Sequence, residues 1–200
     1  MKLASPLSVI DDPRRASLAL DPIRLRLLQE LAQPDSAVGL ARRLGLPRQK
    51  INYHLRLLEE QGLVELVEER RRRNCTERVV RAVAHSYLIN PAALGALAAD
   101  PSRVSDRTSS TYLIATAAQV IRDVASLRDQ ADTAGKKLPT LTLQVDIRFA
   151  SPADQQAFAQ ELSEDVARLT AKYHDDQAAG GRRFRFISGA YPAPAQEEQS

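Results

Sequence analysis

Apolar residues near the start of the chain recur with a helical period in three successive segments. Asp21 and Pro22 form a helix-start signal, because an aspartate side chain accepts hydrogen bonds from free amides and proline already has a helical φ. The three periods end at Pro34, Gly45 and Gly62, which are residues that stop helices. In the third helix the pattern places three residues on the buried face: Ile51, Leu55 and Leu58.

The period then changes to one that is typical of extended chain. The runs Leu63 to Val67 and Val79 to Tyr87 are rich in residues that favour strands, and the polar segment EERRRRNCTE separates them. This arrangement predicts a two-stranded hairpin with a long basic tip. Asn90 and Pro91 start a small helix rich in Ala and Leu, and residues 100–106 lack an apolar period, which is typical of a linker.

A long helix is predicted after this linker. Its apolar residues follow one face for about six turns, and Gly135 ends it. Left uncovered, that face would expose a long apolar surface, so we expect it to pair two copies of the chain; lining an effector cavity is the alternative. The face consists of Leu113, Ala117, Val120, Ile121, Val124, Leu127 and Ala131.

Residues 138–190 combine both periods. In LTLQVDIRF, residues 141–149, apolar and polar side chains alternate as in a half-buried strand. A helix begins near Ser151, and RRFRFIS, residues 182–188, follows as a second strand. This β-α-β unit has no glycine-rich phosphate loop. Because two strands do not form a stable sheet alone, the helix or a second subunit must complete it, and a pocket at that seam is a candidate effector site.

Together these patterns predict a mainly α fold with α+β parts. With 200 residues, 44% of them hydrophobic, the chain is long enough to bury a core. The predicted parts are a flexible arm (1–19), a winged helix-turn-helix DNA-binding domain (20–100), a linker and dimerisation helix (101–137), a β-α-β unit for dimerisation or effector binding (138–190) and a disordered tail (191–200).

Charge and hydropathy narrow the function. Residues 1–90 carry 16 Lys and Arg against 11 Asp and Glu, whereas residues 91–200 carry 12 against 14. A polyanion would therefore meet the first half of the chain. No run approaches the roughly 18 apolar residues that cross a bilayer, so we expect a soluble cytoplasmic protein with no membrane partner.

Three helices followed by a hairpin is the element order of a winged helix-turn-helix. Small Ala41 lets the second and third helices approach, and Gly45 permits the left-handed turn between them. The polar residues of the third helix then face outward, and Arg, Lys, Gln and Asn are side chains that read base edges or hold phosphates. The candidates for contact with double-stranded DNA are Arg48, Gln49, Lys50, Asn52, Tyr53, His54 and Arg56 on that helix and Arg70, Arg71, Arg72 and Arg73 on the hairpin.

The segments DPIRLRLLQEL and LARRLGLPRQKINYHLRLLEEQGLVE, together with the hairpin, resemble ArsR-type bacterial regulators. The recognition helix of that family commonly carries a polar residue, any residue, His and Leu in succession, here Asn52 to Leu55. The resemblance covers about residues 17–90 and implies a homodimeric repressor that leaves DNA when an effector binds. The family's metal sensors use paired cysteines or Asp and His pairs, and this chain, with one cysteine and three histidines, has neither set. We therefore expect no metal, no cofactor and either a small organic effector or no effector.

Several residues have a second interpretation. His54 either contacts DNA or lies half-buried against the preceding helix, and the hairpin arginines either bind DNA or form a solvated tip. Cys75, beside arginines, is either a redox switch or an ordinary loop cysteine, and the ordinary role is the more common. The sequence His174, Asp175, Asp176 resembles a set of metal donors but is also typical of a solvated helix end.

Three classes of function remain. A sequence-specific dimeric transcription regulator accounts for the most features. An architectural protein that coats DNA without an operator would need only the basic hairpin. An enzyme that the first half targets to DNA is disfavoured, and no catalytic residue is expected, because no nucleophile with a neighbouring base and no convincing carboxylate pair appears after residue 100.

Overall fold

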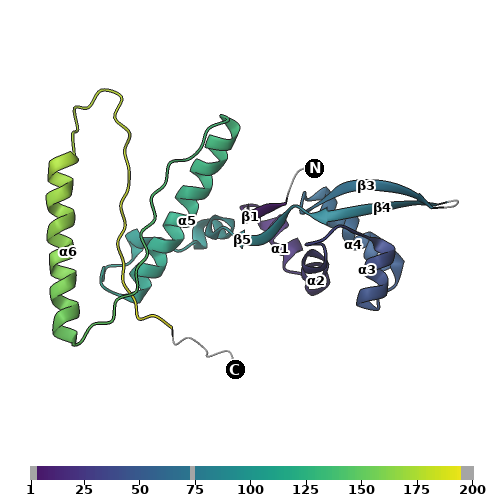
Figure 1. Cartoon of the computed structure of the whole chain (residues 1–200), viewed down its shortest axis with the longest axis horizontal. Coiled ribbons are helices and arrows are strands. Elements are labelled where there is room, and N and C mark those ends of the chain that lie inside the picture. The colour runs from purple at the N-terminus through teal and green to yellow at the C-terminus, as the bar shows by residue number, and fades with distance from the viewer. Residues whose placement is uncertain (1–3, 73–74, 195–200) are drawn as a thin grey trace. The chain divides into compact units, whose positions relative to one another are not determined.

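The structure is a computed structural model that describes residues 4–72 and 75–194. The chain divides into two units, Met1–Leu138 and Pro139–Ser200. The second unit contains one helix, α6 (Pro152–Tyr173), among its described residues. The elements of the first unit (Figure 1) are β1 (Ser5–Ile10), α1 (Pro13–Ala19), α2 (Pro22–Glu30), β2 (Asp35–Ser36), α3 (Ala37–Leu44), α4 (Arg48–Glu60), β3 (Val64–Arg72), β4 (Cys75–Ala82), β5 (Ala84–Ile89), the 3-10 helices η1 (Pro91–Leu97) and η2 (Pro101–Arg103), and α5 (Ser110–Thr133).

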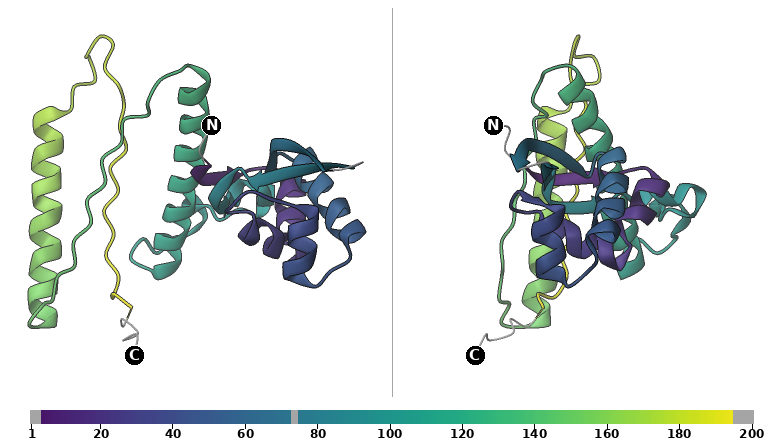
Figure 2. Two further views of the ribbon diagram at one scale, coloured as in Figure 1. Left: turned by 45° about the vertical axis from the view of Figure 1, so that its right-hand side comes forward. Right: turned by 90° about the vertical axis from the view of Figure 1, so that its right-hand side faces the viewer.

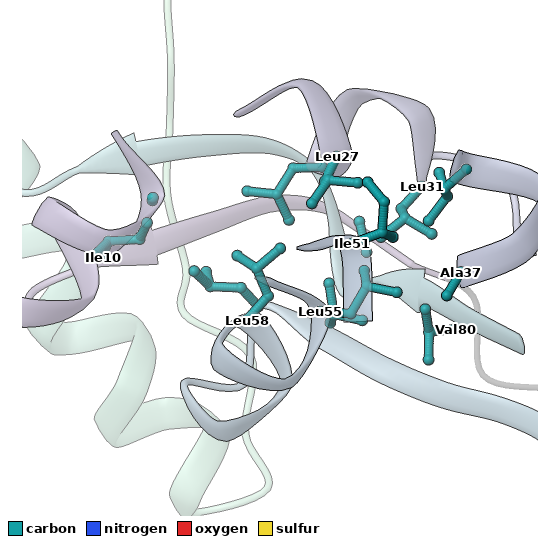
Figure 3. Close-up of a cluster of buried hydrophobic side chains, with 14 of the residues drawn as sticks. Ile10, Leu27, Leu31, Ala37, Ile51, Leu55, Leu58 and Val80 are labelled. Atoms are coloured by element: carbon teal, nitrogen blue, oxygen red, sulfur yellow. The ribbon is translucent and has the colours of Figure 1, made fainter. Parts of the chain in front are cut away.

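The three predicted short helices are α2, α3 and α4, and one cluster of buried side chains holds them together. Figure 3 shows Leu27 and Leu31, from α2 and its C-terminal cap, in the same cluster as Ile51 and Leu58 of α4. The start of α2 follows the predicted signal, since the Asp21 carboxylate accepts hydrogen bonds from the amides of the second and third helical residues at 3.0 and 3.1 Å. Local signals therefore determine where the helices begin and end, and burial determines which side of each helix faces the core.

The predicted hairpin is present, with longer strands than expected. β3 and β4 pair from Val64 and Ala82 out to Arg72 and Cys75, so much of the predicted loop is strand. β2 adds to the other edge of β4, which gives an antiparallel sheet in the order β2-β4-β3. The predicted run 79–87 is divided between β4 and β5. Figure 1 shows the β3–β4 hairpin extending beyond the helices of this unit.

The prediction of a loose arm at residues 1–19 is wrong for its described part. β1 pairs in parallel with β5, and Ile10 at the end of β1 is fully buried. α1 begins after Asp12, whose carboxylate accepts a hydrogen bond from the Arg14 amide at 2.7 Å. The strand that pairs with β1 lies far along the chain, and the local sequence pattern of residues 1–19 gives no signal of such a long-range pairing.

The predicted long helix is α5, and its two sides differ. Ala115, Ala118 and Ala125 are buried within the first unit. Because a helix advances by about 100° per residue, the larger apolar residues Val124 and Leu127 lie on a different face, and both are exposed. The small side chains let α5 approach its own unit closely, whereas Val124 and Leu127 stay partly exposed.

In the second unit, α6 forms as predicted but the two flanking strands do not. Among the described residues, neither 141–149 nor 182–188 forms a strand, and no backbone hydrogen bond joins them, so the β-α-β prediction is wrong for the single chain. Both segments nevertheless run in the same direction, opposite to α6 (Figures 1 and 2). Leu143 is 87% exposed and Phe186 is 78% exposed, so their alternating apolar face lacks cover. The predicted tail lies mostly outside the described residues.

Replacing Ile10 with Ala is expected to lower the free energy of unfolding by about 2–4 kcal/mol, because removing a buried aliphatic side chain leaves a cavity. Leu7→Ala on the same strand is the matched control, since Leu7 is 36% exposed and should cost clearly less. Urea unfolding followed by circular dichroism measures both. Equal, small losses would show that β1 does not pack on the core in solution.

Candidate nucleic-acid interface

α4 presents a polar face to solvent because its apolar residues are buried. Ile51 and Leu58 are fully buried and Leu55 nearly so. Side chains at these spacings share one face of a helix, so most residues between them point away from the core. Of the predicted DNA contacts on α4, five are exposed and one is half-buried: Arg48, Gln49, Lys50, Tyr53 and Arg56 are exposed, and Asn52 is half-buried.

The turn before α4 leaves the start of that helix open. Gly45 adopts φ of 65°, the left-handed conformation predicted for it. The Leu46 amide donates a hydrogen bond to the Ala41 carbonyl at 3.2 Å, which closes the turn after α3. Pro47 precedes α4 and no side chain caps it. The first amides of α4 therefore remain available to an anion such as a phosphate.

An ion pair ties the β3–β4 hairpin to the end of α4. Arg78 of β4 donates two hydrogen bonds to the Glu59 carboxylate, at 3.0 Å from Nη1 and 2.7 Å from Nη2. Its Nε also lies 3.7 Å from a carboxylate oxygen of Glu69 on β3. The hydrogen bonds from the guanidinium to Glu59 raise the pKa of Arg78. This paired geometry sets the position of the hairpin relative to α4, and the sequence analysis singled out neither partner.

The hairpin arginines divide into outer and inner residues. Arg70 and Arg71 are exposed near the outer end of β3, and Arg70 forms an ion pair with Glu68. The backbone of Arg72 belongs to β3, but its side chain and the whole of Arg73 lie outside the described residues. Arg81 is buried and pairs with Glu65, so it serves the fold rather than the surface.

His54 is buried, which favours the packing interpretation over the predicted contact with DNA. Only 7% of His54 is exposed, and it shares the inner face of α4 with Ile51 and Leu58. Burial is the main cause that lowers its pKa; Arg24 and Lys50 lower it further, and the Asp21 carboxylate opposes them. Among the described atoms its Nδ1 finds no hydrogen-bond partner. The alternative of a residue packed against the preceding helix is the better description.

In residues 4–72 and 75–194, no three His, Cys, Asp or Glu side chains gather closely enough to hold a metal ion. His174 and Asp176 are exposed, and Nε2 of the first lies 3.1 Å from Oδ1 of the second. None of the described helices has the length and apolar composition needed to cross a membrane.

Residues 19–67 match the sequence profile of a family described as a helix-turn-helix domain, a winged family that covers ArsR-like regulators. The match spans α2, α3 and α4 and ends within β3. A comparison with curated proteins found no match. A helix-turn-helix domain indicates DNA binding and transcription regulation, and the matched segment carries the exposed polar face of α4.

The burial of His54 predicts that stability depends on pH. Because its pKa is lowered from the ordinary value of 6.5, the folded chain takes up this proton less readily than the unfolded chain does. At pH values above 6.5 the imidazole is neutral in both states and the chain keeps its full free energy of unfolding. As the pH drops from there toward the lower folded-state pKa, the unfolded chain takes up the proton first and the free energy of unfolding falls. Thermal unfolding at about pH 7.5 and about pH 5.5 should show a smaller loss for His54→Gln than for the unaltered chain.

His85 is exposed and supplies the matched control. His85→Gln should keep the pH dependence of the unaltered chain. If His54→Gln loses stability as steeply as the unaltered chain does, His54 is not buried in solution.

Proposed function

We propose that the chain is an ArsR-type transcriptional repressor, located in the cytoplasm, that binds an operator as a homodimer and releases it when a small organic effector binds. The exposed polar face of α4 is the observation that carries the proposal. It lies on the segment that matches the helix-turn-helix family, and the hairpin beside it ends in arginines. The ArsR assignment rests on the resemblance of residues 17–90.

The chemistry of the α4 face suits a major groove. Gln49 and Asn52 have the paired donor and acceptor that read adenine, and Arg48 has the two donors that read guanine. The uncapped amides at the start of α4 and the Lys50 ammonium would hold phosphates. Arg70 would add a further phosphate or minor-groove contact. Base readout would then come from α4, and backbone contacts from the start of α4 and from the hairpin.

Two copies would read two half-sites. One small helix and hairpin make few base contacts, so specific affinity favours a second half-site about one DNA turn, roughly 34 Å, away. The exposed apolar face of α5, with Val124 and Leu127, offers a surface for that pairing. The mass of the chain in solution tests whether this face pairs two copies.

Replacing Gln49 or Asn52 with Ala is expected to reduce the preference for the operator over scrambled DNA by about 5- to 150-fold, the equivalent of about 1–3 kcal/mol. The operator is first selected from a random duplex library, and fluorescence anisotropy at several salt concentrations measures both affinities. The double variant Arg70→Ala, Arg71→Ala should instead weaken binding to both duplexes alike and flatten the salt dependence. An unaltered chain with no preference for any duplex would be a coating protein, not a regulator.

Replacing Val124 and Leu127 together with Asp is expected to convert a dimer into a monomer, because four carboxylates would enter the apolar contact between two copies. Sedimentation equilibrium of the full chain gives the mass. Gln130→Asp places a charge on an exposed position outside this apolar face and should leave the dimer intact. A dimer that survives the double substitution would exclude this face of α5 as the interface.

A further inference from the structure

A crevice of about 440 Å³ separates α5 from the β strands of its own unit. Its walls come from β1, from the base of β3 and from the last turns of α5, and Figure 1 shows β1 beside α5. The polar face of α4 and the outer end of the hairpin do not contribute to it. The volume lies within the usual range for pockets that take small molecules. DNA contact therefore leaves this crevice without a role.

The crevice holds charges of both signs. Arg15 from α1 and Arg128 from α5 supply guanidinium groups, and Glu65, Asp129 and Asp132 supply carboxylates. A guanidinium matches a ligand carboxylate, and a carboxylate matches a ligand ammonium group. A ligand with a single charge would meet like charges on part of the wall, whereas a ligand with both charges finds an opposite charge for each.

The two arginines retain capacity for a ligand. Nη2 of Arg15 donates to the Gly62 carbonyl at 3.1 Å, but its buried Nε has no hydrogen-bond partner among the described residues. Arg128 makes long contacts, 3.4 Å from Nη2 to the Leu7 carbonyl and 3.9 Å from Nε to Asp132. A guanidinium has five N–H donors, so Arg15 and Arg128 both keep donors beyond these contacts for a ligand carboxylate.

We propose that this crevice binds a small zwitterion of the size of a free amino acid, with its carboxylate toward Arg15 and Arg128 and its ammonium group toward Asp129 and Asp132. The part of the proposal that concerns regulation rests on the proposed function; the binding does not. The crevice places the effector site in the first unit instead of in residues 138–190, where the sequence pattern suggested it.

The position of the crevice couples a ligand to DNA binding. Glu65 lies on β3, which continues to the outer end of the hairpin, whereas Asp129 lies on α5. The apolar face assigned to the dimer contact is a neighbouring face of the same helix, since Val124 precedes Arg128 by one helical turn. A ligand that draws α5 toward β3 would change the angle between the dimer contact and α4. The distance between the α4 helices of the two copies, and so their fit to the two half-sites, would change with it.

Isothermal titration of the full chain, without DNA, tests the binding with the twenty amino acids as probes. We expect saturable binding of at least one of them at or below about 1 mM. Its N-acetyl derivative, which lacks the cation, and its amide, which lacks the anion, should each bind at least about 10-fold more weakly. Asp129→Asn and Arg15→Gln should each reduce the affinity by a similar factor.

The controls are Arg14→Gln, the exposed neighbour of Arg15, and Asp165→Asn in the second unit; both should bind as the unaltered chain does. Asp129 is exposed, so its variant remains informative if Arg15→Gln fails to fold. Absence of binding by every amino acid at about 10 mM, or unchanged affinity in the Asp129→Asn variant, overturns the site. Equal binding of the singly charged derivatives overturns the zwitterion.

The regulatory part is measured separately, as operator affinity with and without the bound amino acid. A fall in operator affinity of at least about 5-fold supports it, and an unchanged affinity overturns it. A chain that binds the amino acid but no DNA contradicts the proposed function and leaves the ligand site standing.

Discussion

The one-sided burial of α4 is the constraint on which the other features depend. Ile51, Leu55 and Leu58 belong to one core cluster with Leu27 and Leu31 of the preceding helix. Loss of a single side chain of this kind costs about 2–5 kcal/mol, a large part of the 5–15 kcal/mol that typically holds a domain together. The helix therefore cannot rotate to another face while the unit stays folded. The orientation of the polar residues between these positions is as secure as the fold itself.

The same principle, applied to α5 and to the second unit, identifies surfaces that the single chain leaves open. Ala115, Ala118 and Ala125 bury a narrow face of α5 and leave larger apolar residues outside. In the second unit α6 has no buried residue at all. Exposed apolar faces of this extent cost free energy in water, so we expect another surface to cover them. The first unit buries a core of its own, whereas α6 of the second unit buries no side chain.

How much the sequence could predict depended on the range of the interaction involved. Helix ends set by caps and by Gly45 were predictable because their signals lie within a few residues. The pairing of β1 with β5 was not, since strand partners distant in sequence leave no local period. His54 was predictable in principle: it lies three residues after Ile51 and four before Leu58, a spacing that places it inside. The alternation at 141–149 separates apolar from polar side chains but carries no information about a partner for the backbone, so the predicted half-buried strand is absent from the single chain.

The wing arginines show why counting charges overstates attraction to DNA. Arg78 is bound by Glu59, Arg81 by Glu65, and Arg70 is paired with Glu68, so three of the positive charges counted in residues 1–90 are already offset within the chain. An arginine that already has a carboxylate partner must give up or share that partner to bind a phosphate, so it adds less to affinity than an unpaired arginine does. The pair to Glu59 instead links the hairpin to α4 before DNA arrives. In the proposed complex less conformational freedom would then be lost on binding, so this pair would contribute to recognition through preorganisation.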